Sequence, residues 1–131
     1  MKVTKVRVGL VGLGLVADPH IKAYQANTDA EVVAVCDLDA ARAKFIAGKY
    51  GIEKAYASYE ELLVDDDINT VDITTPTVLH AQMSIAAARS GKNVLCEKPF
   101  CLTLEEGQAA IDEAAAAGVS LMVGESYIFM T

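Results

Sequence analysis

The chain has 131 residues, of which 53% are hydrophobic and 22% charged, a composition typical of compact globular proteins and not of disordered ones. Its formal net charge is −7, and no cluster of lysine and arginine stands out, which argues against nucleic acid as a partner. We expect one domain, because a chain of this length removes roughly two thirds of its unfolded surface from water.

Short apolar runs rich in β-branched residues alternate with helical stretches along the chain. Strands are predicted at 6–11, 32–36, 71–74, 93–96 and 120–123, with a weaker strand at 56–57. Helices are predicted between them at 19–26, 40–50, 59–64, 78–90 and 104–117. Such alternation requires right-handed crossovers, so it predicts an α/β fold, a doubly wound parallel sheet of the Rossmann type.

The segment VRVGLVGLGLVADPH, residues 6–20, contains a glycine-rich turn between the first predicted strand and helix. Gly12 permits a tight turn, and Gly14 lets the backbone approach a pyrophosphate. The small Ala17 lets the helix pack closely on the strand, and the helix N-terminus offers N–H donors and a positive dipole end. We therefore predict that this turn binds a dinucleotide, through Gly12, Leu13, Gly14, Leu15 and Val16.

The same segment superficially resembles an export signal. Lys2, Lys5 and Arg7 precede an apolar run, as they do in a signal peptide. That alternative leaves unexplained the glycine spacing, the helix that starts near Pro19, and the acidic residue that ends the second predicted strand. His20, which follows Pro19, is expected to be structural or at most peripheral to the phosphates.

The acidic residue at the end of the second predicted strand is Asp37. Its carboxylate can accept hydrogen bonds from the adenosine ribose and would repel a 2′-phosphate, so NAD is favoured over NADP. Two alternatives remain: Asp37 caps the following helix, or Arg42 in that helix accommodates a phosphate. A methyltransferase that uses S-adenosylmethionine shows a similar turn and acid, so this pair alone does not exclude one.

The discriminating residues follow two later strands. TTPTVLH (74–80) and CEKPF (96–100) lie where strands end, the edge at which open parallel sheets bind ligands. With the glycine turn and Asp37, they resemble the N-terminal domain of the Gfo/Idh/MocA oxidoreductases, the family of glucose-fructose oxidoreductase and inositol 2-dehydrogenase. The resemblance covers essentially the whole chain. It implies NAD or NADP as cofactor, and hydride transfer to or from a secondary alcohol of a sugar, inositol or related polyol.

The resemblance also implies roles for individual residues. It makes Lys98 the catalytic lysine, near the nicotinamide and the reacting hydroxyl, and it makes Thr75, Pro76, His80 and Glu97 lining of the nicotinamide half of the site. A lysine at a strand end suits this role, because the strand holds it in place and its ammonium can donate to a substrate oxygen.

Three of these positions carry additional expectations. Taken without the resemblance, Lys98 is a solvated charge paired with Glu97. His80 has an alternative as a residue that caps or packs at the start of a helix. The resemblance further implies a cis peptide bond between Lys98 and Pro99, which would direct the lysine into the cleft.

The three cysteines, Cys36, Cys96 and Cys101, are an odd set without the spacing of a disulfide framework, which suits a reducing compartment. We therefore expect a cytoplasmic protein. No cluster of cysteine and histidine has metal-ligand spacing, so no metal site is expected. The longest weakly polar run, 114–124, is shorter than the roughly 20 residues that cross a bilayer, so no membrane association is expected.

Members of the family have two domains, and the resemblance implies that residues 1–124 form the dinucleotide-binding domain and 125–131 begin the crossover to a substrate domain. Ser126 and Ile128 stand where the family usually has Asn and Arg. We expect a fragment of a longer dehydrogenase, in preference to a stand-alone or designed domain. It should bind cofactor with little or no turnover and self-associate through the apolar residues 127–130. A non-catalytic NAD-sensing module is the alternative.

Overall fold

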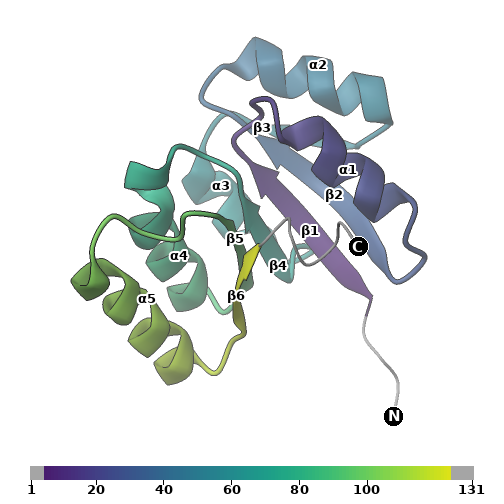
Figure 1. Cartoon of the computed structure of the whole chain (residues 1–131). Helices are drawn as coiled ribbons and strands as arrows, with labels where there is room; N and C mark the ends of the chain where they lie inside the picture. Colours follow the sequence, from purple (N-terminus) through teal and green to yellow (C-terminus); the bar gives the residue numbers. More distant parts are fainter. Residues whose placement is uncertain (1–4, 125–131) are drawn as a thin grey trace, which may run out of the picture.

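The computed structural model describes residues 5–124, which form one parallel sheet with helices on both faces (Figure 1). The expected domain boundary at 124/125 and the expected self-association through 127–130 involve residues outside the described part. The strands of the described part are β1 (Val6–Val11), β2 (Ala30–Cys36), β3 (Lys54–Tyr56), β4 (Thr70–Ile73), β5 (Asn93–Glu97) and β6 (Leu121–Gly124).

Helices connect these strands in the predicted alternation. Side chains cap three of them at the N-terminus, namely Asp39, Ser58 and Thr103. The helices are α1 (Ala17–Gln25), α2 (Ala40–Tyr50), α3 (Tyr59–Leu63), α4 (His80–Arg89) and α5 (Leu104–Ala117), with a short 3-10 turn, η1 (Thr77–Leu79), before α4.

The strand order is β3-β2-β1-β4-β5-β6, and every neighbouring pair is parallel. The chain begins in the middle of the sheet, builds outward through β2 to β3, and then returns to add β4 on the other side of β1. This order is that of doubly wound dinucleotide-binding folds, so the predicted fold class is confirmed. The direction of winding switches between β1 and β4, and ligands bind beyond the carboxyl ends of the strands at such a point.

Two apolar cores lie on opposite faces of the sheet. On one face, β1 and β2 pack against α1 and α2 through residues that include Val8, Leu10, Ile21, Val35 and Ile46. On the other face, β4 and β5 pack against α3 and α4 through residues that include Leu62, Ile73, Met83, Ala87 and Cys96. Helix α5 packs against α4, and Figure 1 shows the two side by side. Helices cover both faces of the sheet around β1. A ligand can therefore reach the centre of the sheet only at the ends of its strands, and the carboxyl ends lie at the switch point.

Most element boundaries differ from prediction by one or two residues, and β2, for example, begins at Ala30 where 32 was expected. Helix α1 begins at Ala17, before the predicted start at 19, and contains Pro19 in its first turn. Proline is tolerated there, because the first N–H groups of a helix have no intrahelical partner. The predicted helix 78–90 begins instead as η1 and becomes α4 at His80. Strand β3 covers Lys54–Tyr56, where 56–57 was expected.

Candidate functional site

Gly12 forms the turn that follows β1. Its φ is +90°, a conformation that L side chains rarely adopt. A Cβ at this position would lie 2.8 Å from the backbone nitrogen of Thr75, so the turn is pressed against the end of β4. The Gly12 N–H donates to the carbonyl oxygen of Cys36 at 2.9 Å. The turn is thereby fixed to the strands on both sides of it, and only glycine fits.

Asp37 braces this turn from the end of β2. Its Oδ2 accepts a hydrogen bond from the N–H of Leu13, and its Oδ1 accepts one from the N–H of Asp39, both at 2.9 Å. The N-cap of α2 is Asp39, which accepts from the N–H groups of Ala41 and Arg42. The alternative that Asp37 caps α2 is therefore wrong.

Leu13, which was expected to contact the cofactor, makes its contacts within the protein. Its side chain is 2% exposed and belongs to the apolar core, and its N–H donates to Asp37. Both groups are therefore engaged within the protein, and the expectation that Leu13 contacts the cofactor stays a prediction. Its carbonyl oxygen accepts a hydrogen bond from Nε of Arg42 at 3.0 Å, so this cation is held beside the turn.

The start of α1 carries no side-chain cap. Val16 occupies the N-cap position without a side-chain hydrogen bond, and Leu15 is 96% exposed. Beyond the chain neighbours of Gly14, no described atom lies within 4 Å of the place where a Cβ would be. Contacts with the described residues therefore do not require glycine at this position. An uncapped helix start behind a glycine turn offers N–H donors and a positive dipole end to an anion.

A cavity of about 320 Å³ opens at the carboxyl ends of β1, β2 and β4. Its position is the switch point of the strand order, where open α/β sheets bind ligands. It brings together four of the predicted cofactor residues, Gly12, Asp37, Thr75 and Pro76. Side chains of η1, α3 and α4 complete the wall, namely Tyr59, Glu60, Leu79, Gln82 and Met83.

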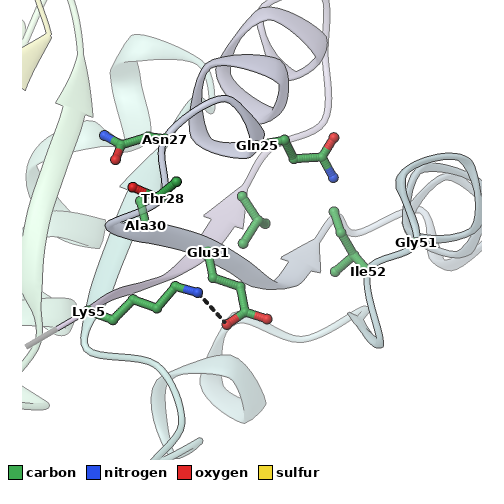
Figure 2. Close-up of a pocket in the computed structure, with 9 residues that line it drawn as sticks. Lys5, Gln25, Asn27, Thr28, Ala30, Glu31, Gly51 and Ile52 are labelled. Carbon is green, nitrogen blue, oxygen red and sulfur yellow. Dashed lines mark ion pairs between the residues drawn. The ribbon is translucent and has the colours of Figure 1, made fainter.

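A second cavity, of about 310 Å³, lies at the opposite edge of the sheet, near the amino ends of β1 and β2. Figure 2 shows Lys5 and Glu31 on its wall, joined by an ion pair of 3.7 Å between Nζ and Oε2. None of the predicted site residues lines it. The cavity at the carboxyl edge is therefore the candidate ligand site.

His80 is buried beneath the site, with 1% of its surface exposed. Its Nδ1 lies 2.8 Å from the carbonyl oxygen of Pro99, and its Nε2 lies 2.7 Å from the carbonyl oxygen of Thr75. The imidazole therefore joins the segment after β4 to the segment after β5. This geometry favours the alternative in which His80 packs, because the ring does not reach the surface of the cavity. The ring links Thr75, on the wall of the cavity, to Pro99 in the segment after β5.

Glu97 and Lys98 lie further along the same edge, at the end of β5. Glu97 pairs in register with Gly124 of β6, and Lys98 follows it as a half-buried residue. Neither residue lines the cavity beside Asp37. The peptide bond between Lys98 and Pro99 is cis, as the family resemblance implies. The predicted site residues thus form two groups along one edge of the sheet, one at β1, β2 and β4 and the other at β5.

Sequence reasoning misses one polar cluster, which joins α1 to β4 and β5. His20 Nδ1 lies 2.7 Å from Asp72 Oδ2, and His20 Nε2 lies 3.0 Å from Glu97 Oε2. The hydroxyl of Tyr24 donates to the same Asp72 oxygen at 2.7 Å. Two signals in the sequence point to this cluster: His20 and Tyr24 share a helix face, and Asp72 is a charge within an apolar strand. His20 contacts the end of β5 and not the glycine turn.

Burial raises the pKa of the Cys36 thiol to about 11 and that of Cys96 to about 12. Both thiols are therefore protonated near neutral pH and are not activated nucleophiles. Within residues 5–124, no group of three or more His, Cys, Asp or Glu side chains is arranged to hold a metal ion. In the same part of the chain, no helix is both long enough and apolar enough to cross a membrane.

Comparison with known proteins identifies the family. Residues 6–125 match the Gfo/Idh/MocA model, described as an oxidoreductase family with an NAD-binding Rossmann fold. The chain belongs to the Gfo/Idh/MocA oxidoreductase family. The resemblance drawn from the sequence is thereby confirmed, and the described residues are the NAD-binding Rossmann domain of this family.

Curated proteins with similar sequences include dehydrogenases named for sugars and for inositol. D-apiose dehydrogenase from Paraburkholderia graminis is 34% identical over 95% of this chain and 33% of its own length. D-xylose 1-dehydrogenase (NADP(+)) 2 from Haloferax volcanii is 42% identical over 93% of this chain and 37% of its own. Inositol 2-dehydrogenase from Salmonella typhimurium is 40% identical over 81% of this chain and 32% of its own. The chain spans about a third of the length of these relatives.

Solved Gfo/Idh/MocA structures superpose closely on this domain. The WlbA dehydrogenase from Bordetella pertussis, in complex with NADH and UDP-GlcNAcA, is 30% identical with a TM-score of 0.86, over 92% of this chain and 37% of its own. The open conformation of KijD10, a 3-ketoreductase from Actinomadura kijaniata in complex with TDP-benzene and NADP, is 32% identical with a TM-score of 0.86, over 90% and 37%. Solved relatives therefore hold either nicotinamide dinucleotide.

Proposed function

We propose that the chain binds NAD along the carboxyl edge of its sheet. The observation that carries this proposal is the cavity at the switch point, where Gly12, Asp37 and Thr75 converge from three strands. The glycine turn and the uncapped start of α1 offer donors for the pyrophosphate. The carboxylate of Asp37, on the cavity wall, is the acceptor for the adenosine ribose hydroxyls.

The same carboxylate favours NAD over NADP. A 2′-phosphate on the ribose would bring like charge against Asp37, which is disfavoured. Arg42 lies nearby, but its Nε donates to the carbonyl oxygen of Leu13, so it is committed in part to the turn. Relatives are named with either cofactor, and the preference of this chain therefore depends on its own residues.

We propose further that the whole protein oxidises or reduces a secondary alcohol position of a sugar, inositol or related polyol, in keeping with the names of its relatives. A bound nicotinamide supplies the hydride chemistry. Lys98, held at the end of β5, donates a hydrogen bond from its ammonium to the reacting oxygen. Glu97 beside it lines the same half of the site. His80 joins the segment after β4 to the segment after β5. Because the chain spans about a third of its relatives, turnover requires residues outside this domain.

Calorimetric titration with NAD, NADP and S-adenosylmethionine tests the binding proposal. We expect NAD to bind more tightly than NADP, and the Asp37→Ala variant to shift the ratio of the two affinities toward NADP. The ratio of the two affinities is the decisive readout, because Asp37 also holds the glycine turn through its hydrogen bond with Leu13. Loss of that hydrogen bond alone would weaken the binding of NAD and of NADP by the same factor. Binding of S-adenosylmethionine alone would show that the methyltransferase alternative is correct.

The catalytic part of the proposal is tested separately, on the full-length protein. Lys98→Ala is expected to abolish most turnover while NAD still binds. Unchanged turnover in that variant would show that Lys98 is not the catalytic residue. An absence of turnover in a full-length parent protein that still binds NAD would favour the non-catalytic NAD-sensing alternative.

A further inference from the structure

The hydrogen bonds among His20, Asp72 and Glu97 indicate which ring nitrogens of His20 carry a proton. Both ring nitrogens of His20 face carboxylate oxygens, at 2.7 Å for Asp72 Oδ2 and at 3.0 Å for Glu97 Oε2. An ionised carboxylate only accepts hydrogen bonds, and a neutral imidazole has one N–H to donate. With both carboxylates ionised, only the imidazolium form of His20 satisfies both contacts.

Burial orders the cluster from the core outward. The side chain of Asp72 is fully buried, whereas those of His20 and Glu97 are each 22% exposed. Among the described residues, Asp72 Oδ1 has no hydrogen-bond partner, so the compensation of its charge falls on the groups at Oδ2, which are His20 and Tyr24. A buried carboxylate of this kind requires a paired cation, and His20 is placed to supply it.

The titratable groups that face His20 come from three elements. Tyr24 lies on α1, Asp72 on β4 and Glu97 on β5. The hydrogen bond to Asp72 raises the pKa of His20, against an opposing effect of burial, and Glu97 adds to the increase. Burial and the charge of Asp72 raise the pKa of Tyr24, so its hydroxyl stays a donor. The contacts of His20 with both carboxylates therefore favour its protonated form, in which each ring nitrogen donates to one of them.

We infer that His20 is a positioning residue, which uses Asp72 as its buried anchor to hold the Glu97 carboxylate in one place at the end of β5, directly before Lys98. This inference rests on the proposed function, in which Glu97 and Lys98 line the nicotinamide half of the site. A glutamate side chain left free would have to be ordered when the cofactor binds. The link to His20 orders it beforehand, which strengthens binding.

The position of His20 on α1 gives the link a second consequence. The start of α1 follows the glycine turn, which is proposed to take the pyrophosphate, and His20 follows within the same helix. One residue of this helix thus reaches across β4 to the end of β5. The two halves of the proposed cofactor site are joined through a single side chain.

The test uses this chain, with His20→Gln as the main variant. The protonation state of the His20 ring is read by nitrogen NMR, and its signals are assigned by their loss in the variant, since the chain has two histidines. We expect both ring nitrogens of His20 to be protonated at pH 7. Calorimetry should show NAD bound about threefold to tenfold more weakly by His20→Gln. In the parent chain, NAD affinity should fall as pH rises through the pKa of His20, and in the variant this fall should be absent.

A second variant covers the case in which His20→Gln fails to fold because Asp72 is left unpaired. The double variant His20→Gln/Asp72→Asn removes the buried charge together with its partner, and the same loss of NAD affinity and of its pH dependence is expected. A ring of His20 with one protonated nitrogen at pH 7 would overturn the inference, as would a folded variant with the NAD affinity and pH profile of the parent. If the parent chain binds no NAD although His20 is doubly protonated, the proposed function fails, and the role of the cluster in binding fails with it.

Discussion

Lys92 donates from Nζ to the carbonyl oxygen of Ile68 at 2.8 Å, although it is only 5% exposed. A second hydrogen bond from the same atom reaches the carbonyl oxygen of Asp65 at 2.9 Å. Both acceptors belong to the segment that enters β4, and Lys92 directly precedes β5. A single ammonium thus fixes the approach to β4 from the neighbouring strand, at the edge of the sheet opposite the site.

Replacement of Lys92 by methionine keeps the apolar stem and removes the donor. We expect the free energy of unfolding to fall by about 1–3 kcal/mol, because two hydrogen bonds from the buried ammonium are lost, although the Asp65 carbonyl oxygen keeps the N–H of Ile68. Urea denaturation measures this change. Lys44→Met, on an exposed position of α2, is the matched control and should change stability by less than about 0.5 kcal/mol. Equal effects at the two positions would show that the buried hydrogen bonds contribute little.

Two glycine-to-alanine substitutions should have opposite effects on stability. Gly12→Ala places a Cβ 2.8 Å from the Thr75 nitrogen at a φ of +90°, so we expect a loss of at least about 1–3 kcal/mol. Gly48→Ala lies at an exposed position within α2, where no described atom beyond the chain neighbours and the adjacent helix backbone comes within 4 Å of the new methyl group. There alanine should raise stability by about 0.5–1 kcal/mol. Thermal or urea unfolding of both variants decides the matter, and a stabilising Gly12→Ala would contradict the turn geometry.

The contribution of His20 to stability should depend on pH with a defined sign. Its folded-state pKa is raised above the ordinary value of 6.5, chiefly by the hydrogen bond to Asp72. The stabilisation from this shift is fully present below pH 6.5 and is lost as pH rises through the folded-state pKa. The difference in unfolding free energy between the parent chain and His20→Gln should therefore shrink as pH rises. A difference that stays constant or widens over that window would argue against a charged His20.

The three thiols should differ in reactivity. At pH 8 the Cys36 and Cys96 thiols are protonated and buried, with pKa values raised to about 11 and about 12. We expect a thiol reagent to modify Cys101, which is partly exposed, well before the other two. Mass spectrometry after a timed reaction locates the modification, and unfolding in urea should make all three residues react. Early modification of Cys96 would mean that the core around β5 opens readily.

The fold was largely predictable because its signals are local. The apolar runs of β1, β4 and β5 and the glycine turn after β1 are each contained within a few consecutive residues. Boundaries were less accurate where two local tendencies competed, as at Pro19, which marks a helix start by composition yet lies inside the first turn of α1. The 3-10 turn after Pro76 was missed for a similar reason, since its residues also suit the start of a helix.

The site was predictable only in part, because several of its contacts join distant segments. Gly12 and Asp37 were identified from spacing, and the cavity brings them together with Thr75. The contacts of His20 to Asp72 and Glu97, and of His80 to Pro99, depend on which strands become neighbours. Such pairings are set by the tertiary structure, and no local pattern in one sequence specifies them.

The central position of β1 has a consequence for how the chain folds during synthesis. Each strand after β1 pairs with one that has already been made: β2 with β1, β3 with β2, β4 with β1, β5 with β4 and β6 with β5. The sheet can therefore grow outward at its two open edges as the ribosome releases the chain, and no strand has to be inserted between two that are already paired.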